Sequence, residues 1–360
     1  MIANPTCCKV ISGMNSTYRL YILPVLVALL LLIALYLDLL PRSNTVQSDT
    51  RLAMGTLVTI SVWGVPQVKA EQAMQKAFMH IARLEEVLAW QRPSSEVRKI
   101  NQDSRGTWLP VSEELAKLVE LGLRVTELSH GAFSVGLQPL TALWGFSSDQ
   151  PRSEPPPPAM IAAWLAAYPA LQAVQLRKNH DGAYQIKLQN DSVGLDLGAV
   201  GKGYAIDQAI AVLQQEGVMN AIINAGGDLR VIGSKGAQPW RIGLQNPREP
   251  EHIVSQSLLR GNVAMMTSGD YERYFIFEGK RYHHILDPVT GYPAQSGLSS
   301  VSVQGQNASL INGLSTALFV LGAKEGMPLL AAVPGSEALL IDLDGQRVQS
   351  KGFVVDWLQQ

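Results

Sequence analysis

Apolar residues recur along the chain with two different periods. Residues 57–63 alternate apolar and polar side chains and are rich in β-branched types, which predicts a strand. In residues 68–90 the apolar side chains return every three or four positions, which predicts an amphipathic helix. A second helix is expected over residues 112–129, with Ser112 at its N-cap and Gly131 beyond its end.

The second half of the chain alternates short strands and helices, separated by glycine and Asn-Pro turns. We expect a hairpin over residues 273–285 that turns at Glu278-Gly279, helices over 204–215 and 308–321, and strands over 192–197, 221–224, 229–232, 240–244, 301–303 and 337–343. Hairpins with only occasional βα units favour an α+β domain with mixed or antiparallel sheets over a doubly wound parallel fold.

A proline-rich stretch, PRSEPPPP, occupies residues 151–158. Because consecutive prolines are stiff, we expect this stretch to join neither a helix nor a central strand. The stretch could divide two lobes, but we favour a surface insertion, because the chemically interesting motifs fall on both sides of it.

The most apolar segment lies near the N-terminus. Residues 21–37 contain 17 largely apolar residues, and the run continues to residue 40. This length is close to the lower limit of about 17 residues for a membrane-spanning helix. A cleaved signal peptide is the alternative, but no small-residue cleavage site follows at Leu39-Leu40-Pro41-Arg42. The segment is therefore expected to be an uncleaved anchor.

Charges around this segment suggest its orientation. Lys9 and Arg19 precede it, and the positive-inside rule then favours a cytoplasmic tail and an exported domain. Both cysteines, Cys7 and Cys8, lie before the span, so the exported part carries no thiol. The expected organisation is a tail over residues 1–20, a transmembrane anchor over 21–40, a linker over 41–50 and one domain over 51–360.

Overall charge excludes one class of partner. The chain has 29 Lys and Arg against 30 Asp and Glu, a formal net charge of -1. It shows no basic stripe interleaved with aromatic residues, so we expect no nucleic-acid partner. Function must be sought in local motifs.

The strongest local motif is GLDLGAVGKGYA at residues 194–205. It is expected to run from a strand through a glycine-rich loop, residues 198–203, into a helix. Free N–H groups at a helix start bind phosphate, and Lys202 adds a positive charge. The motif matches neither the P-loop nor the GxGxxG spacing, and a tight turn that needs glycine for packing is the alternative.

Two adjacent histidines, His283 and His284, lie at the end of the expected hairpin. Successive strand residues face opposite sides, so only one of the two can point into a given cleft. That histidine could act as a general base near neutral pH, while a solvated hairpin end is the alternative.

A third motif lies on the helix expected at residues 308–321. Asn312 and Thr316 are four residues apart, hence on one helix face, and both offer oxygen atoms to a hard cation. Residues of these types also serve as packing or capping groups in many buried helices.

Taken in order, these segments resemble the ApbE family of FAD:protein FMN transferases. The resemblance covers nearly all of the part expected outside the membrane. It rests on Met54-Gly55-Thr56, Ser95-Glu96, Asn101, GAFSVGLQPLTALWGF (131–146), LDLGAVGKGYAID (195–207), NAGGDLRVIG (224–233), TSGDYERYF (267–275), HHILDPVTGYP (283–293) and STALFVLG (315–322).

The resemblance implies one α+β, T-fold-like domain with FAD in a deep cleft. His284 would be the general base, and the metal would be held by the main-chain oxygen of Ala199 with the side chains of Asn312 and Thr316. The residues implied at the cofactor are Met54, Ala132, Phe133, Ser134, Asp196, Lys202 and Ile285, with Asp196 on the adenosine side and Ile285 at the flavin.

The implied reaction is a magnesium-dependent transfer of FMN from FAD to a threonine hydroxyl, with release of AMP. Family targets are flavin-carrying subunits of sodium-pumping NADH:quinone reductases and of Rnf-type complexes. These targets agree with a single-pass protein of the bacterial inner membrane whose catalytic domain faces the periplasm.

Three positions depart from the family pattern. Asn312 stands where the family usually has Asp, which removes a negative charge from the metal site. Ser134 stands where Asp is common. The aromatic residue that usually precedes the Ser-Glu pair falls near Gln91, one place from Trp90.

Three other functions stay open at this stage. Water could replace threonine, which would make the protein an FAD pyrophosphatase that releases FMN and AMP. The protein could instead bind or store FAD without catalysis, or serve as a membrane-tethered scaffold.

Overall fold

The computed structural model describes residues 27–29, 44–146 and 152–357. Residues 1–20 and all but three residues of the predicted anchor lie outside the described residues, so the anchor stays a prediction. From Asn44 onward the chain forms a single compact unit. The proline-rich stretch therefore does not separate two lobes.

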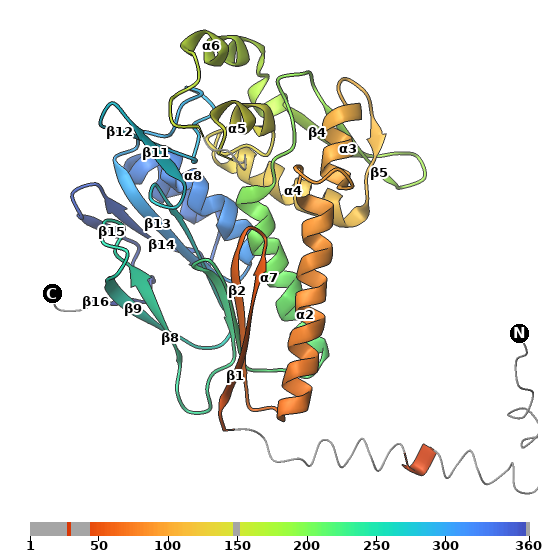
Figure 1. Ribbon diagram of the computed structural model, residues 1–360, viewed down its shortest axis with the longest axis vertical. Coiled ribbons are helices and arrows are strands. Elements are labelled where there is room, and N and C mark those ends of the chain that lie inside the picture. The colour runs from red at the N-terminus through yellow and green to blue at the C-terminus, as the bar shows by residue number, and fades with distance from the viewer. Residues whose placement is uncertain (1–26, 30–43, 147–151, 358–360) are drawn as a thin grey trace, which may run out of the picture. The chain divides into compact units, whose positions relative to one another are not determined.

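An eight-stranded sheet forms the centre of this unit (Figure 1). Every neighbouring pair of its strands is antiparallel. Its strands, in spatial order, are β1 (Val46–Ala53), β2 (Thr56–Trp63), β6 (Ala221–Ala225), β7 (Asp228–Ile232), β10 (Val263–Gly269), β13 (Leu298–Gly305), β14 (Glu337–Asp342) and β15 (Arg347–Gln349).

Alternation along these strands sends apolar side chains to both faces of the sheet. On β10, Ala264 and Met266 join a core formed with helices, whereas Met265 between them joins a core on the opposite face. The period of two in a strand requires this division. The sheet therefore contributes to a core on each of its faces.

Helices cover one face and a small sheet covers the other. The helices are α2 (Gln67–Leu88), α7 (Gly198–Gln215) and α8 (Ala308–Gly326), and α7 packs between the other two. The covering sheet consists of β8 (Trp240–Gln245), β9 (Ile253–Leu259) and β16 (Asp356–Trp357).

The remaining elements build the upper part of Figure 1. A third sheet with its helices packs around a second core, which α2 and α7 share. The elements of this part are α3 (Glu96–Asp103), α4 (Glu113–Leu128), β3 (Leu109–Pro110), β4 (Val174–Lys178), β5 (Tyr184–Leu188), α5 (Gln138–Trp144), α6 (Pro158–Ala167), the hairpin β11 (Tyr274–Phe277) with β12 (Lys280–His283), and the 3-10 turn Ala170–Gln172. A second 3-10 turn, Met327–Ala332, follows α8 and packs against β14.

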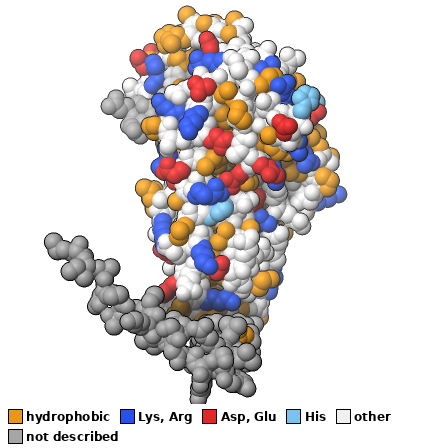
Figure 2. Space-filling view, turned by 90° about the vertical axis from the view of Figure 1, so that its right-hand side faces the viewer, with side chains coloured by type: hydrophobic (Ala, Val, Ile, Leu, Met, Phe, Trp, Pro, Cys, Tyr) orange, Lys and Arg blue, Asp and Glu red, His pale blue; other side chains and the backbone are white. Residues whose placement is uncertain are grey.

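The face on the right-hand side of Figure 1 carries acidic and basic side chains intermixed (Figure 2). This distribution matches the formal net charge of -1. A mixed surface of this kind exerts no strong one-sign field on approaching molecules.

Most of the predicted elements are confirmed. The strands expected at 57–63, 221–224, 229–232, 240–244, 301–303 and 337–343, the helices at 68–90, 112–129 and 308–321, and the hairpin all form within one to five residues of the expected ends. Ser112 caps α4 as expected, because its side chain accepts a bond from the backbone N–H of Leu115 at 3.3 Å. The α+β prediction is correct in its antiparallel form.

Four local predictions were wrong. Residues 46–50 belong to β1 and not to the linker, because they pair in register with β2. Residues 192–197 form no strand, and the glycines of 198–203 lie inside α7 and not in a loop. Pro158 is the first residue of α6, a position where a helix tolerates proline.

Within the described residues, one helical segment is long and apolar enough to cross a membrane by length and composition alone. This segment, Ala308–Ala332, comprises α8 and the 3-10 turn that follows. Gly322 kinks it, and its residues pack in the core between the main sheet and α7. Its apolar character is therefore explained by burial in the protein.

Candidate active site

A cleft of about 1070 Å³ opens where the main sheet, α7, α8 and the β11–β12 hairpin meet. Its size suits a dinucleotide, since ligand pockets generally hold about 300–1,000 Å³. Its lining contains all eleven residues that the sequence pointed to: Met54, Ala132, Phe133, Ser134, Asp196, Ala199, Lys202, His284, Ile285, Asn312 and Thr316.

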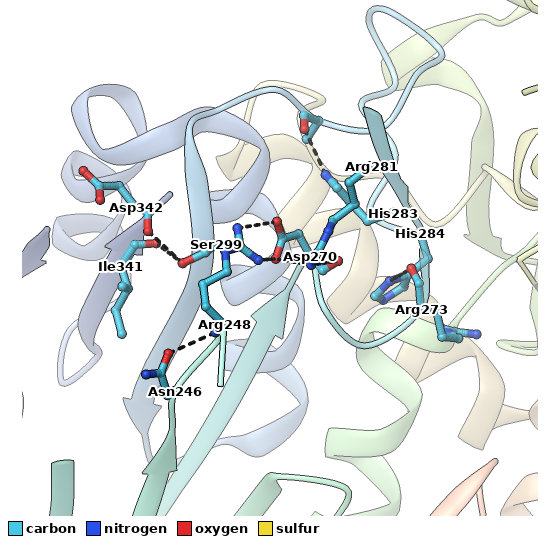
Figure 3. Close-up of polar contacts among 11 residues, drawn as sticks. Asn246, Arg248, Asp270, Arg273, Arg281, His283, His284, Ser299, Ile341 and Asp342 are labelled. Carbon is cyan, nitrogen blue, oxygen red and sulfur yellow. Dashed lines mark hydrogen bonds and ion pairs between the residues drawn. The ribbon is translucent and has the colours of Figure 1, made fainter. Parts of the chain in front are cut away.

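His284 follows directly after β12 and lies on the cleft wall (Figure 3). The carbonyl of Arg273 accepts a bond from the His284 backbone N–H at 3.0 Å and lies 3.3 Å from its Nδ1. Because a carbonyl can only accept, Nδ1 carries the proton and Nε2 keeps a free lone pair. Burial, the Arg273 guanidinium and His283 hold the pKa of His284 well below its usual 6.5. The ring is therefore a neutral base at neutral pH.

His283 faces the other way, as strand alternation predicted. It is buried, its Nε2 lies 3.0 Å from the Ala294 carbonyl, and its ring meets Phe319 edge to face. Burial lowers the pKa of this histidine as well. It is absent from the cleft lining and packs into the protein interior against Phe319.

A buried carboxylate fixes the base of the same hairpin. Asp270, only 4% exposed, accepts two bonds from Arg248, each of 2.8 Å, and a longer one of 3.5 Å from Arg281 on β12 (Figure 3). A bidentate pair of this kind is among the stronger and more directional polar contacts in proteins. It ties β12 to the loop between β8 and β9.

The first turn of α7 borders the cleft. Asp196 Oδ1 accepts a bond of 3.1 Å from the backbone N–H of Gly198, the first residue of the helix. Glycine is needed deeper in the helix for packing, since a Cβ on Gly203 would lie 2.3 Å from the Ala308 carbonyl oxygen of α8. The close packing expected in the alternative interpretation is thus present, but within a helix and not in a tight turn. The helix start nevertheless still lines the cleft and can receive phosphate.

Lys202 stands one turn further along α7 and pairs with Asp228. The Asp228 side chain is 1% exposed, and its Oδ1 also accepts a bond of 3.0 Å from the Thr267 N–H. A buried carboxylate with two partners holds the ammonium at the cleft wall. Asp228 had been quoted within the NAGGDLRVIG motif but given no role.

The expected cation ligands come together at the α7–α8 contact. Asn312 Oδ1 accepts a bond of 3.2 Å from the backbone N–H of Gly203. In an α-helix this N–H points to the carbonyl four residues earlier, which is that of Ala199. Thr316 Oγ1 lies 3.2 Å from Ser268 Oγ and donates to the Asn312 carbonyl at 3.4 Å. The predicted helix face is confirmed as a lining of the cleft.

These three ligands fit magnesium only in part. All are oxygen donors, as a hard cation requires, but none carries a charge. The described residues contain no group of three or more His, Cys, Asp or Glu side chains that could hold a metal. The set therefore suits a cation that arrives with an anionic partner, such as a diphosphate.

Other residues expected at the cofactor also line the cleft. Met54 has the unusual φ of 53°, and its N–H donates to Glu85 at 3.0 Å. Ser134 Oγ lies 2.6 Å from the Tyr168 hydroxyl, whose pKa burial raises to about 12. Trp90 and Gln91 both border the cleft, so the departure from the family pattern leaves an aromatic ring there.

Residues to which the sequence motifs gave no role also line the cleft. The charged ones are Glu85, Arg92, Asp228, Arg241, Glu272 and Arg273. Glu272 and Arg273 lie in the TSGDYERYF motif, so their place in a recognised segment was the available signal.

Comparison with known proteins places the chain in a family. The ApbE family model matches residues 54–340. The FAD:protein FMN transferase of Klebsiella pneumoniae is 33% identical over 292 residues, which cover 81% of this chain and 82% of that protein. The transferase of the same name from Rhodobacter capsulatus is 35% identical over 81% of this chain, but the chain spans only 54% of its length.

Solved structures show the same fold. The ApbE protein of Thermotoga maritima has a TM-score of 0.77 at 32% identity, with 85% of this chain and 97% of that chain covered. The flavin transferase ApbE of Vibrio cholerae has a TM-score of 0.74 at 26% identity, covering 86% and 98%.

Fold, cleft and relatives together define an enzyme of the transferase class. The chain belongs to the ApbE family.

Proposed function

We propose that this protein is an FAD:protein FMN transferase that uses Mg²⁺ and modifies a threonine of an acceptor protein. The observation that carries the proposal is the convergence of eleven residues from five separate motifs on one cleft. Among them a neutral, oriented imidazole stands in the same cleft as a helix N-terminus and an ammonium group.

The residues that line the cleft have separate roles in the proposed reaction. The α7 start and Lys202 bind the diphosphate of FAD. Nε2 of His284 takes the proton of the threonine hydroxyl, whose oxygen attacks the FMN-side phosphorus. A P–O bond forms to threonine, and the P–O bond to AMP breaks. Bound by Ala199, Asn312 and Thr316, Mg²⁺ would neutralise phosphate charge and stabilise the leaving AMP.

We also propose where the reaction takes place. The apolar segment at residues 21–40 anchors the protein in the bacterial inner membrane, with the domain in the periplasm. The acceptors are flavin-carrying subunits of sodium-pumping NADH:quinone reductase or Rnf-type complexes, as the family resemblance implies.

The test is mass spectrometry of an acceptor subunit incubated with the full-length protein, FAD and Mg²⁺. We expect a covalent adduct of one FMN on threonine and one AMP released per adduct. His284→Ala should bind FAD and yield no adduct, and an acceptor with Val in place of the threonine should stay unmodified. Free FMN without an adduct would indicate a pyrophosphatase, and intact FAD would indicate a binding protein.

A further inference from the structure

Four basic side chains line the cleft: Arg92, Lys202, Arg241 and Arg273. Arg92 pairs with Glu85 and Glu86, and Lys202 pairs with Asp228. Among the described residues, no carboxylate forms an ion pair with Arg241 or Arg273. Arg241 belongs to β8 in the covering sheet, whereas Arg273 belongs to the segment that carries the general base.

Arg273 is held at both of its ends. Its carbonyl accepts from the backbone N–H and Nδ1 of His284, at 3.0 and 3.3 Å. Its guanidinium Nη1 donates to the Phe146 carbonyl at 3.4 Å, a contact that engages one of its five N–H groups. Arg273 lies beside His284 in Figure 3. An exposed guanidinium with spare donors thus belongs to the cleft lining, on the residue whose carbonyl orients the His284 ring.

We propose that Arg273 is a second catalytic residue, whose guanidinium binds a non-bridging oxygen of the FMN-side phosphate during transfer. The inference rests on the proposed function and adds a residue to it. As the threonine oxygen bonds to phosphorus and the AMP oxygen leaves, charge spreads over the non-bridging oxygens. The forked guanidinium meets two acceptors in one plane, which an ammonium cannot do. The threonine proton goes to Nε2 of His284.

The position of Arg273 also gives it an electrostatic effect on the base. The charged and titratable groups that act on His284 are Arg273, His283 and Lys202, and all three disfavour its protonation. Removal of the guanidinium should therefore raise the pKa of His284. A residue that served only to stabilise the fold would not produce this change.

The first experiment compares three variants of the full-length protein by single-turnover FMN transfer and by FAD binding. Arg273→Gln should lower kcat about 10²–10³-fold, the usual loss when one donor to a transition-state oxyanion is removed. The affinity for FAD should change much less, because the contact strengthens in the transition state. Arg273→Lys should show an intermediate loss of kcat.

Arg260→Gln is the matched control. Its guanidinium also donates to a carbonyl, that of Ala237, but outside the cleft, and transfer should stay at the wild-type rate. A wild-type kcat in Arg273→Gln would overturn the inference. So would a loss confined to FAD affinity.

The second experiment needs no turnover. NMR titration of the His284 ring should give a higher pKa in Arg273→Gln than in the wild-type protein, and a value near wild type in Arg273→Lys. An unchanged titration in Arg273→Gln would overturn the inference even if kcat fell. If the wild-type protein transferred no FMN, the proposed function would fail. If the wild-type protein were active and Arg273→Gln had the same kcat, only the role of this residue would be refuted.

Discussion

At the scale of single residues, one carbonyl decides which nitrogen of His284 can accept a proton. The Arg273 oxygen lies 3.3 Å from Nδ1 and takes its N–H, so Nε2 is the basic atom. Strand alternation could predict that one histidine of the pair faces a cleft. It could not predict the tautomer, because Arg273 lies eleven residues away and reaches His284 only when the hairpin closes.

The lowered pKa of His284 predicts the pH dependence of transfer. The catalytic form is neutral, and protonation abolishes it. Since burial and Arg273 hold the pKa well below 6.5, activity should persist at pH 6.5 and fall only at more acid pH, through the folded-state pKa. The pH profile of kcat/KM for FAD measures this value. An acid limb centred at or above pH 6.5 would contradict the assignment of His284 as the base.

Asn312 is the residue that sets the charge of the cation site. Replacement by Asp adds a carboxylate beside the Thr316 and Ala199 oxygen atoms that are proposed to bind the cation. The new side chain keeps an oxygen that can accept from the Gly203 N–H. We expect Asn312→Asp to bind Mn²⁺ without FAD on the order of tenfold more tightly, because ligand charge governs the affinity of hard cations. Electron paramagnetic resonance of free Mn²⁺ during titration gives the affinity.

The control for this change is Asn262→Asp, which adds the same charge on the surface, next to Arg230 and outside the cleft. Its Mn²⁺ affinity should equal that of the wild-type protein. Equal affinities in all three proteins would show that the side chain at position 312 does not touch the cation.

At the scale of elements, the glycines of α7 show why a motif can be located correctly and its conformation missed. Glycine clusters usually mark loops, so residues 198–203 were expected to be irregular. Gly203 instead allows α7 to approach the backbone of α8, a contact between segments about a hundred residues apart. No local pattern contains that information.

This packing gives a stability prediction. Gly203→Ala would place Cβ 2.3 Å from the Ala308 carbonyl oxygen, so the helices must separate. We expect a loss of about 1–3 kcal/mol in the free energy of unfolding, typical of an overpacked core. Separation would also displace Asn312 from Ala199 and weaken binding of a cation. Chemical denaturation measures the first effect.

Gly201→Ala is the matched control within the same helix. Its Cβ would meet only Leu88 Cδ1 at 3.7 Å, an ordinary contact, so helix propensity should dominate and stabilise the protein by about 0.5–1 kcal/mol. Equal destabilisation by both substitutions would contradict the packing explanation.

At the scale of the whole molecule, periodicity was enough to predict an α+β fold with mixed or antiparallel sheets, because the hydrophobic pattern of each strand and helix is local. The strands that were missed depend on partners. β1 carries exposed polar residues such as Ser48 and Thr50, and it is a strand because it pairs with β2. The sheet of β3, β5 and β4 joins segments from both sides of α4 and of the proline-rich stretch. The site residues were recognised because the family resemblance implied a role for each of them. Arg273 also lies in a recognised motif, TSGDYERYF, but its role emerged only from its neighbours in space.

The order of anchor and domain along the chain yields the last prediction. The compact unit begins at Asn44, and β1 begins at Val46, so a chain that starts at residue 44 keeps the complete sheet. We expect this truncated protein to fold with unchanged FAD affinity and to leave the membrane fraction. The full-length protein should stay in the membrane after an alkaline carbonate wash, because residues 21–40 are apolar enough to span it.

Protease treatment of spheroplasts tests the orientation. With Lys9 and Arg19 inside, the domain should be exposed outside the inner membrane and be cleaved while the cells stay sealed. Addition of positive residues after the span, in place of Ser43 and Asn44, should weaken this preference, since the charge difference across the span determines it. A domain protected in intact spheroplasts would place catalysis in the cytoplasm, where exported acceptor segments are out of reach. Recovery of the truncated protein with the membranes would show that another part of the chain binds them.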